Sequence, residues 1–337
     1  MTDDDGRGAT SDAAAVPNWE PEAGVDRLTV RTYRALAGLG RVGLIVVATV
    51  LGLVQVAIAG VAVRSRPSLA GLFLLSFVPA FTVAWIVYRR DAVREPLGLL
   101  AGTAILGALF STFAGVSNTV GLFALVEAFP TVSDPGAAAQ TTTGFAAFSL
   151  FMFLFVGPVE EFVKWLAVRL LSFRSEWFDS ALDGAVYGAM AGLGFAAAEN
   201  LQYVAGVGLQ GGPFVAVLDT AVTRAFVGPN HVLWAAISGY YLGLAKRYPQ
   251  FRGPLVLKGL LVAAFLHGFF NVTVGLFVTG FDRLTGSGQR LALAVYVVGF
   301  AAVVSVYLAR TLSRHQAVDA GVERERERRS SRPRRRE

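Results

Sequence analysis

Eight apolar stretches, each about as long as a membrane-spanning helix, make up most of the chain, and short polar segments separate them. About 20 residues of apolar helix are enough to cross a bilayer. The predicted spans are Val42–Val63, Leu69–Tyr88, Leu97–Phe123, Phe145–Leu171, Gly184–Val207, Pro229–Ala245, Pro254–Val278 and Leu291–Ala309. This pattern predicts an all-α fold, a polytopic membrane helix bundle of about eight transmembrane helices.

The composition agrees with this prediction and sets the predicted domains. Of the 337 residues, 54% are hydrophobic and only 16% are charged, so the chain needs lipid around its apolar side chains. Residues 1–40 are rich in Asp, Ala and Gly and are predicted to be a disordered cytosolic arm. Residues 41–310 form the predicted transmembrane domain, with its core motifs at 145–278. Residues 311–337 form a basic cytosolic tail.

Arginines between the spans predict the orientation of the protein in the cell membrane. Most of them fall on the side that holds the tail, so both termini are predicted to be cytoplasmic. Eight arginines crowd the tail, at positions 324, 326, 328, 329, 332, 334, 335 and 336. Such a run favours contact with anionic lipids. No nucleic-acid partner is expected, because base-stacking aromatics are not interleaved with the arginines.

Ionisable residues inside four successive spans are the chemically informative feature of the chain. They are Glu160 with Glu161, then Glu199, His231 and His267. Charge-capable side chains are expensive in a bilayer and are functional-site candidates by default. Glu160, Glu199, His231 and His267 lie 11 to 15 residues from the inner ends of their spans, which is roughly 16–22 Å of helix. The four groups are therefore predicted to share one layer of the membrane.

Local spacing suggests how these groups are supported. Glu160 and Lys164 are four residues apart on one helix face and can pair, while Glu161, three residues from Lys164, points about 100° away from Glu160. One of the two carboxylates is expected to pair with the lysine and the other to face the reaction. His267 and Asn271 have the same four-residue spacing and can reach a common oxygen atom. Glycines at 184, 188, 192 and 194 predict close approach of neighbouring helices. Residues 214–227, of mixed polarity, are predicted to form a re-entrant or interfacial helix that gates substrate.

This set of side chains suits the hydrolysis of a peptide bond by water. A buried carboxylate can take a proton from water, while His and Asn donate hydrogen bonds to the developing oxyanion. Alternatively, Glu and His side chains bind Zn²⁺, which activates the water; the predicted ligands are Glu199, His231 and His267. The chain has no His-Glu-x-x-His motif and no cysteine, so a standard zincin site and thiol chemistry are excluded.

Four ordered motifs resemble those of the PrsW family of intramembrane proteases. They are Glu160-Glu161-x-x-Lys164, Phe195-x-x-x-Glu199-Asn200, His231 at the head of a span, and His267-x-x-x-Asn271. The resemblance covers about residues 145–278. Related CAAX-type endopeptidases carry a His where this chain has Glu199, which favours the PrsW branch. The resemblance implies cleavage of membrane-protein substrates and, in the founding bacterial case, site-1 cleavage of an anti-sigma factor. It leaves a metalloprotease and a glutamate-dependent hydrolase both open.

The sequence therefore predicts an intramembrane endopeptidase with assigned roles for its polar residues. Glu160 is the expected general base, with Glu161 as the next candidate. Glu199 and His231 orient the water or bind a metal, and His267 and Asn271 stabilise the oxyanion. Lys164 and Asn200 support the site. Two alternatives remain: a proton- or cation-coupled transporter that uses the same residues as a relay, and a non-catalytic membrane scaffold.

Overall fold

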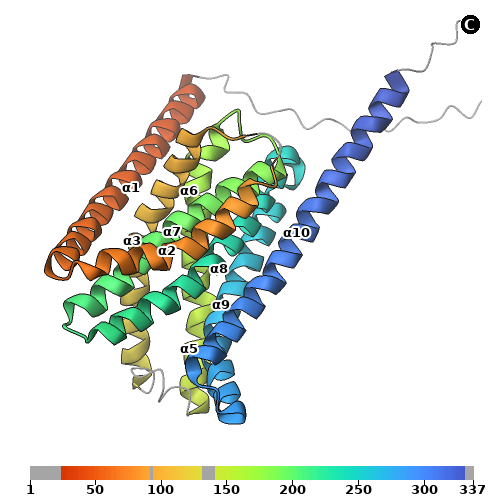
Figure 1. The fold of residues 1–337 in the computed structure, drawn as a ribbon. Coiled ribbons are helices and arrows are strands. Elements are labelled where there is room, and N and C mark those ends of the chain that lie inside the picture. Colours follow the sequence, from red (N-terminus) through yellow and green to blue (C-terminus); the bar gives the residue numbers. More distant parts are fainter. Residues whose placement is uncertain (1–23, 92–93, 131–140, 331–337) are drawn as a thin grey trace, which may run out of the picture. The chain divides into compact units, whose positions relative to one another are not determined.

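The computed structural model describes residues 24–91, 94–130 and 141–330, and this part of the chain is helical without strands. Its long helices are α1 (Gly24–Ser65), α2 (Ser68–Tyr88), α3 (Leu97–Ala128), α5 (Thr142–Phe151), α6 (Gly157–Leu170), α7 (Ala181–Leu209), α8 (Phe214–Arg247), α9 (Arg252–Thr285) and α10 (Gln289–Ser330). Figure 1 shows their arrangement. The predicted all-α helix bundle is confirmed.

The structure divides into one unit that ends at Val46 and a second that runs from Val47 to the C-terminus. Residues 1–23 of the predicted disordered arm lie outside the described residues. Residues 24–40 are helical, because a run rich in Ala, Leu and Arg favours a helix that continues into the first span. The predicted domain boundary at 310 lies inside α10. All residues discussed below belong to the second unit.

Helix α7 forms the core of the second unit, where it packs against α2, α3, α6 and α8 (Figure 1). In its most apolar window 83% of the residues are buried, compared with 22–39% in the other candidate spans. A Cβ on Gly184, Gly188 or Gly192 would collide with the backbone of α8, and one on Gly194 would collide with α3. The glycines thus bring backbones into contact, as predicted.

Seven helices in the described residues are long and apolar enough to cross a membrane. Each of seven predicted spans falls within one of them, and the eighth, Pro229–Ala245, lies in α8. The predicted gating segment 214–227 is not a separate helix, because α8 runs without interruption from Phe214 to Arg247 with Pro229 inside it. Polar residues within α8 and the basic residues of its last turn make this helix less apolar than α2, α7 and α9; they are Asp219, Arg224, Asn230, His231, Lys246 and Arg247. It is enclosed by α2, α7, α9 and α10.

A change in helical pitch presents the first acidic motif to the interior. Between α5 and α6 the chain forms a π-helix, η2 (Met152–Val156), in which the backbone N–H of Gly157 bonds to the carbonyl oxygen of Met152. Pro158 follows and has no N–H to donate, so the regular pattern cannot pass through this point. π-Helical turns occur often at functional sites. Here the turn lies immediately before Glu160.

Candidate active site

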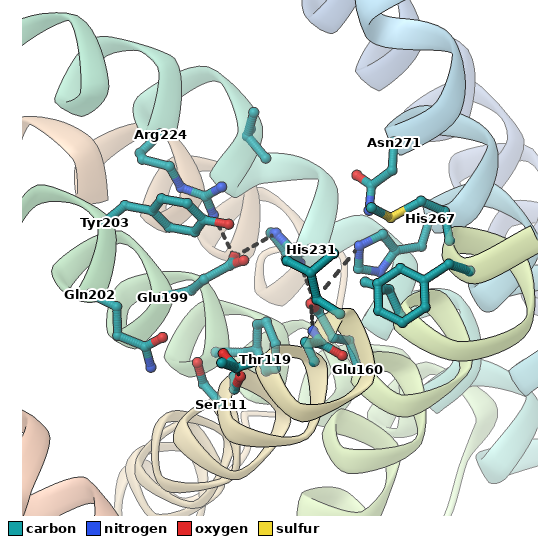
Figure 2. A pocket seen from close by; sticks show the side chains of 18 of the residues that line it. Ser111, Thr119, Glu160, Glu199, Gln202, Tyr203, Arg224, His231, His267 and Asn271 are labelled. Atoms are coloured by element: carbon teal, nitrogen blue, oxygen red, sulfur yellow. Dashed lines mark hydrogen bonds and ion pairs between the residues drawn. The ribbon is translucent and has the colours of Figure 1, made fainter. Parts of the chain in front are cut away.

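A cavity of about 530 Å³ opens between α3, α5, α6, α7, α8 and α9, and the ionisable residues of four helices converge on it (Figure 2). The polar side chains that line it are those of Ser111, Asn118, Thr119, Glu160, Glu199, Gln202, Tyr203, Arg224, His231, His267 and Asn271. The other residues that line the cavity are mainly apolar and include Phe148, Phe151 and Met152. Helix periodicity alone predicted four of these groups at one depth, and the structure brings those four together.

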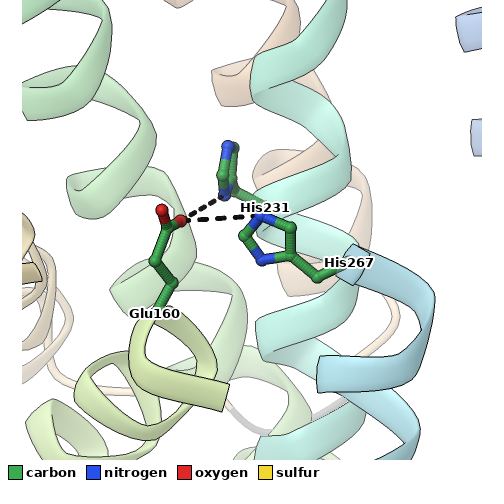
Figure 3. Close-up of side chains that lie close together, drawn as sticks. All are labelled: Glu160, His231 and His267. Atoms are coloured by element: carbon green, nitrogen blue, oxygen red, sulfur yellow. Dashed lines mark ion pairs between the residues drawn. The ribbon is translucent and has the colours of Figure 1, made fainter. Parts of the chain in front are cut away.

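Three of these side chains direct single atoms at one another (Figure 3). Oε2 of Glu160 lies 4.0 Å from Nδ1 of His231 and 3.7 Å from Nε2 of His267. One potential ligand atom from each of the three residues lies within 4.8 Å of the other two. All three side chains are buried, and Oε2 of Glu160 has no hydrogen-bond partner in the described part of the chain.

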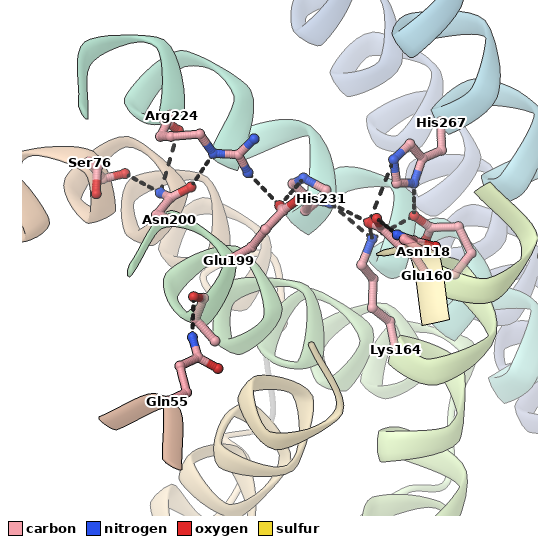
Figure 4. Close-up of polar contacts among 12 residues, drawn as sticks. Gln55, Ser76, Asn118, Glu160, Lys164, Glu199, Asn200, Arg224, His231 and His267 are labelled. Carbon is pink, nitrogen blue, oxygen red and sulfur yellow. Dashed lines mark hydrogen bonds and ion pairs between the residues drawn. The ribbon is translucent and has the colours of Figure 1, made fainter. Parts of the chain in front are cut away.

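Both histidines are held by a carboxylate on their other nitrogen. Nε2 of His231 lies 2.9 Å from Oε2 of Glu199, and Nδ1 of His267 lies 2.8 Å from Oε1 of Glu161 (Figure 4 shows the first contact). A carboxylate only accepts hydrogen bonds, so each of these nitrogens carries the proton. The lone pairs therefore lie on Nδ1 of His231 and Nε2 of His267, the two atoms that face Glu160.

Lys164 pairs mainly with Glu161, a choice between the two carboxylates that the spacing argument left open. Its Nζ lies 2.7 Å from Oε1 of Glu161 and 3.9 Å from Oε2 of Glu160. Nζ also lies 2.9 Å from Nδ1 of His231 and 4.1 Å from the ring centre of Phe195. Glu161 and Lys164 are completely buried, and neither lines the cavity. Glu161 therefore holds Lys164 and His267, and Glu160 is the acid that faces the cavity.

The charges around the cavity do not balance. Three carboxylates, those of Glu160, Glu161 and Glu199, face the two cations Lys164 and Arg224, which leaves one negative charge when the histidines are neutral. In an apolar environment such a surplus is costly. A proton on Glu160 or a cation held by the three facing atoms would remove it. Two imidazole lone pairs and a carboxylate oxygen are a ligand set that zinc uses.

The geometry assigns the three ligand atoms differently from the sequence prediction. Glu199 was predicted as a ligand with His231 and His267, but it lies against Nε2 of His231, on the far side of the ring from His267. The three potential ligand atoms that lie together belong to Glu160, His231 and His267. The two nitrogens of an imidazole point in different directions, and sequence spacing does not show which one a carboxylate on another helix reaches. Carboxylates behind metal-binding histidines commonly orient them.

Arg224 is a site residue that the sequence analysis missed. It forms an ion pair with Glu199, and its Nε donates a hydrogen bond to Oδ1 of Asn200 at 2.8 Å (Figure 4). Asn200 in turn donates to the backbone oxygen of Ser76 at 2.9 Å and does not line the cavity. The segment that carries Arg224 was expected to be a gating element outside the spans. An arginine one turn before the Gly-Pro-Asn-His sequence was the available signal.

Two asparagines complete the cavity wall. Asn118, which the sequence pattern did not mark as a site residue, donates from Nδ2 to Oε1 of Glu160 at 2.8 Å. Asn271 lines the cavity near His267, as its spacing predicted, and its amide donates to the sulfur of Met152 at 3.6 Å (Figure 2). One oxygen of Glu160 is thus fixed by the protein, and the other faces the two histidines.

A buried pocket of acids and imidazoles within a helix bundle is the kind of site that a membrane-embedded hydrolase requires, and comparison with known proteins agrees. A family model described as PrsW family intramembrane metalloprotease matches residues 95–308. The match covers more than half of the chain, which therefore belongs to this family. The chain is an integral membrane protein and a protease, and the family predicted from its motifs is confirmed.

Several relatives named Protease PrsW match the chain. The one from Oceanobacillus iheyensis is 28% identical over 194 residues, which is 57% of this chain and 78% of the relative. The one from Geobacillus kaustophilus is 32% identical over 167 residues, 49% of this chain and 67% of the relative. The one from Bacillus subtilis is 34% identical over 121 residues, 35% of this chain and 51% of the relative. No solved structure matches.

Proposed function

We propose that the cavity around Glu160 is the active site and that it hydrolyses peptide bonds of membrane-protein substrates. One observation carries this proposal. Three lone-pair-bearing atoms, Oε2 of Glu160, Nδ1 of His231 and Nε2 of His267, face one another inside a bundle of apolar helices. Acceptors that face one another repel unless a proton or a cation lies between them. Lys164 lies 2.9 Å from Nδ1 of His231 but 3.9 Å from Oε2 of Glu160, and that oxygen has no hydrogen-bond partner among the described residues, so a structural role does not account for it.

Glu160 is the proposed general base. Asn118 holds Oε1, so Oε2 is the atom that can take a proton from the attacking water and later deliver it to the leaving amine. In the alternative arrangement the residues fit a zinc ion, which Glu160, His231 and His267 would hold, with Oε2 of Glu160 as a ligand and not as the base. Zn²⁺, when bound, would supply Lewis acidity toward the water and the scissile carbonyl group. Lys164 contacts the same nitrogen of His231, so binding of the ion requires this lysine to move aside.

The remaining residues orient these groups and stabilise charge. Glu161 and Glu199 fix the tautomers of the two histidines, and Lys164 and Arg224 keep those two carboxylates ionised. Asn271 lines the cavity beside His267, and its amide would donate a hydrogen bond to the oxygen of a tetrahedral intermediate. His267, whose proton lies on Nδ1 against Glu161, has no donor facing that oxygen and so does not take the oxyanion role expected for it. Each role follows from what the side chain contacts.

The proposed substrates are membrane proteins whose spans enter the bundle. Release of a membrane-tethered regulator, such as an anti-sigma factor, fits a protease of this kind. We place the protein in the cell membrane with both termini in the cytoplasm and with its basic tail on anionic lipids. Because the chain has no cysteine, single cysteines at Ser330 and Ser133 can test this topology. An impermeant maleimide applied to intact cells should label the cysteine at 133 and spare the one at 330.

The activity can be tested with purified protein in lipid nanodiscs and a single-pass membrane substrate. Glu160→Gln keeps the size of the side chain and removes the base, so cleavage should fall about 10²–10⁴-fold. Glu127→Gln, an exposed change on α3, is the matched control and should cleave like wild type. In the zinc arrangement a chelator should stop cleavage by the wild type, and added Zn²⁺ should restore it.

Two outcomes would contradict parts of the proposal. Cleavage that is lost in Glu160→Gln but is indifferent to the chelator would replace the zinc arrangement with hydrolysis by glutamate alone. If Glu160→Gln cleaves like wild type, the active site lies elsewhere. A protein that moves protons or cations across liposomes and cleaves no substrate would instead support the transporter alternative.

A further inference from the structure

A protease that acts inside the membrane must first unwind its substrate. A membrane-spanning helix satisfies its own backbone N–H and C=O groups, and each unpaired group costs several kcal/mol in a lipid environment. Cleavage requires a few residues to leave the helix so that the scissile carbonyl can be attacked. An active site of this kind therefore needs hydrogen-bonding groups for the freed backbone beside the reacting carbonyl.

One wall of the cavity offers such groups. Along α3, the residues that line the cavity are Ser111, Gly115, Asn118, Thr119 and Leu122. Ser111 is 1% exposed, and its Oγ has no hydrogen-bond partner among the residues that the structure describes. Oδ1 of Asn118 is also buried without a partner there. Leaving such groups unpaired is costly, so they are well suited to a partner from outside the chain.

The spacing of these two groups suits an extended segment. Ser111 and Asn118 are seven residues apart on α3, so they are two turns, or about 10 Å, apart along the helix axis. An extended chain covers that distance in about three residues. Asn118 also contacts Glu160, the proposed base, so its end of the wall lies beside the reacting bond. Ser111 would meet the substrate about three residues away from that bond.

Gly115 lies between Ser111 and Asn118 and faces the end of the Gln202 side chain, so a substrate backbone reaches it only when that flexible side chain turns aside. A Cβ at this position would lie 3.1 Å from Oε1 of Gln202, which belongs to the opposite wall on α7. Figure 2 shows Gln202 across from Ser111 and Thr119. The α3 wall and Gln202 therefore border a narrow passage that opens when the Gln202 side chain turns aside and that has polar groups on both sides.

We propose that the α3 wall, formed by Ser111, Gly115 and Asn118, is a subsite that binds the unwound backbone of the substrate in extended form. Ser111 bonds to a backbone group about three residues from the scissile bond, and Asn118 bonds beside that bond. The inference rests on the proposed active site at Glu160. It assigns the recognition to the main chain of the substrate, so this wall tolerates different side chains.

A double-mutant cycle between protein and substrate tests the subsite. Synthetic single-pass substrates would carry one backbone change each, either an ester or an N-methyl group, at the second to fourth position on either side of the cleaved bond. Ser111→Ala should lower kcat/KM for the unmodified substrate about tenfold. At one position of the substrate, the backbone change should lower kcat/KM of the wild type about tenfold. The same change should not lower kcat/KM of Ser111→Ala any further, because the hydrogen bond is already lost.

Matched variants separate binding from a general loss of structure. Ser238→Ala removes an equally buried hydroxyl whose partner is the backbone oxygen of Ala235 on its own helix, and it should cleave like wild type. Gly115→Val should raise KM by blocking the passage, while Gly98→Val on the same helix meets no atom within 4 Å and should leave KM unchanged.

The outcomes distinguish this subsite from the active site itself. If Ser111→Ala cleaves like wild type, or if its penalty multiplies with every backbone change at all positions, the α3 wall does not bind substrate backbone. In either case a loss of cleavage in Glu160→Gln still supports the active site. Conversely, an active Glu160→Gln enzyme removes the basis of both proposals.

Discussion

Two groups of three potential metal ligands occur in the described part of the chain, and they differ in where their lone pairs point. The first consists of Glu160, His231 and His267, and the second of Asp91, Glu95 and Asp183. In each group one ligand atom per residue lies within 4.8 Å of the others. Proximity alone therefore does not distinguish an active site from a set of neighbouring acids.

In the second group, the carboxylates of Asp183 and Glu95 are engaged by donors from the chain itself. Asp183 accepts hydrogen bonds from the backbone N–H groups of Asp179 at 2.8 Å and Ser180 at 2.7 Å, in a capping box that starts α7. Glu95 accepts a hydrogen bond from the hydroxyl of Tyr187. In the first group, carboxylates hold the outer nitrogens of the histidines and Lys164 contacts Nδ1 of His231, but Oε2 of Glu160, which faces both histidines, has no hydrogen-bond partner among the described residues. This contrast identifies the first group as the stronger metal candidate.

The largest expected difference between the two groups is in the zinc bound by variants of each. His231→Ala or His267→Ala removes a ligand from the first group and should lower the zinc bound by purified protein at least about tenfold. Glu95→Gln changes the second group and should leave the zinc content unchanged. The measurement is elemental mass spectrometry after dialysis in dilute zinc. Equal zinc in all four proteins, or its loss only in Glu95→Gln, would reverse the assignment.

Substitution of Arg224 should have the next largest effect, on the rate of cleavage. Arg224 pairs with Glu199, and Glu199 in turn orients His231. Arg224→Gln leaves Glu199 free to turn away, and loss of such an outer partner typically costs 10–100-fold. We expect a fall in kcat of about this size, with partial recovery in Arg224→Lys. Arg290→Gln is the matched control, because it removes a largely exposed arginine that pairs with Asp219. A fall in the rate of Arg290→Gln equal to that of Arg224→Gln would show that the effect is not local.

Substitutions in the second group should change the stability of the protein and not its catalytic rate. Glu95 lies before the α3 span and is 3% exposed, and burial raises its pKa to about 7. The folded protein then keeps this proton up to about pH 7, whereas the unfolded chain releases it near pH 4.5. Stability is therefore lost as the pH rises between these values, by up to about 3 kcal/mol.

Glu95→Gln abolishes this titration, so its unfolding free energy relative to wild type should increase between pH 5 and pH 8. Detergent-solubilised proteins unfolded by denaturant at both values would provide the measurement, with Glu127→Gln as the exposed control. Substrate cleavage at a fixed pH should stay within about twofold of wild type. A constant stability difference across the range would mean that Glu95 titrates normally.

The sequence alone was sufficient to predict the membrane spans and to select the candidate site residues. Apolar length predicts a transmembrane helix well, because a bilayer has a fixed thickness and a helix has a fixed rise per residue. The same rise placed Glu160, Glu199, His231 and His267 at one depth before any packing was known. Glycine spacing predicted the close contact of α7 with α8 for an equally simple reason, since only glycine has no side chain to hold the backbones apart.

Only the tertiary structure decided which atom faces which. Spacing on one helix left open which of the two carboxylates pairs with Lys164. The lysine pairs with Glu161, because α6 is oriented by its packing on α3, α7 and α9. The partners of each histidine come from other helices, and so does Arg224, whose segment looked like a peripheral element. Sequence periodicity fixes the face of a helix on which a side chain lies. The rotation and tilt of neighbouring helices fix the direction of its hydrogen bonds, and those depend on contacts between residues far apart in the chain.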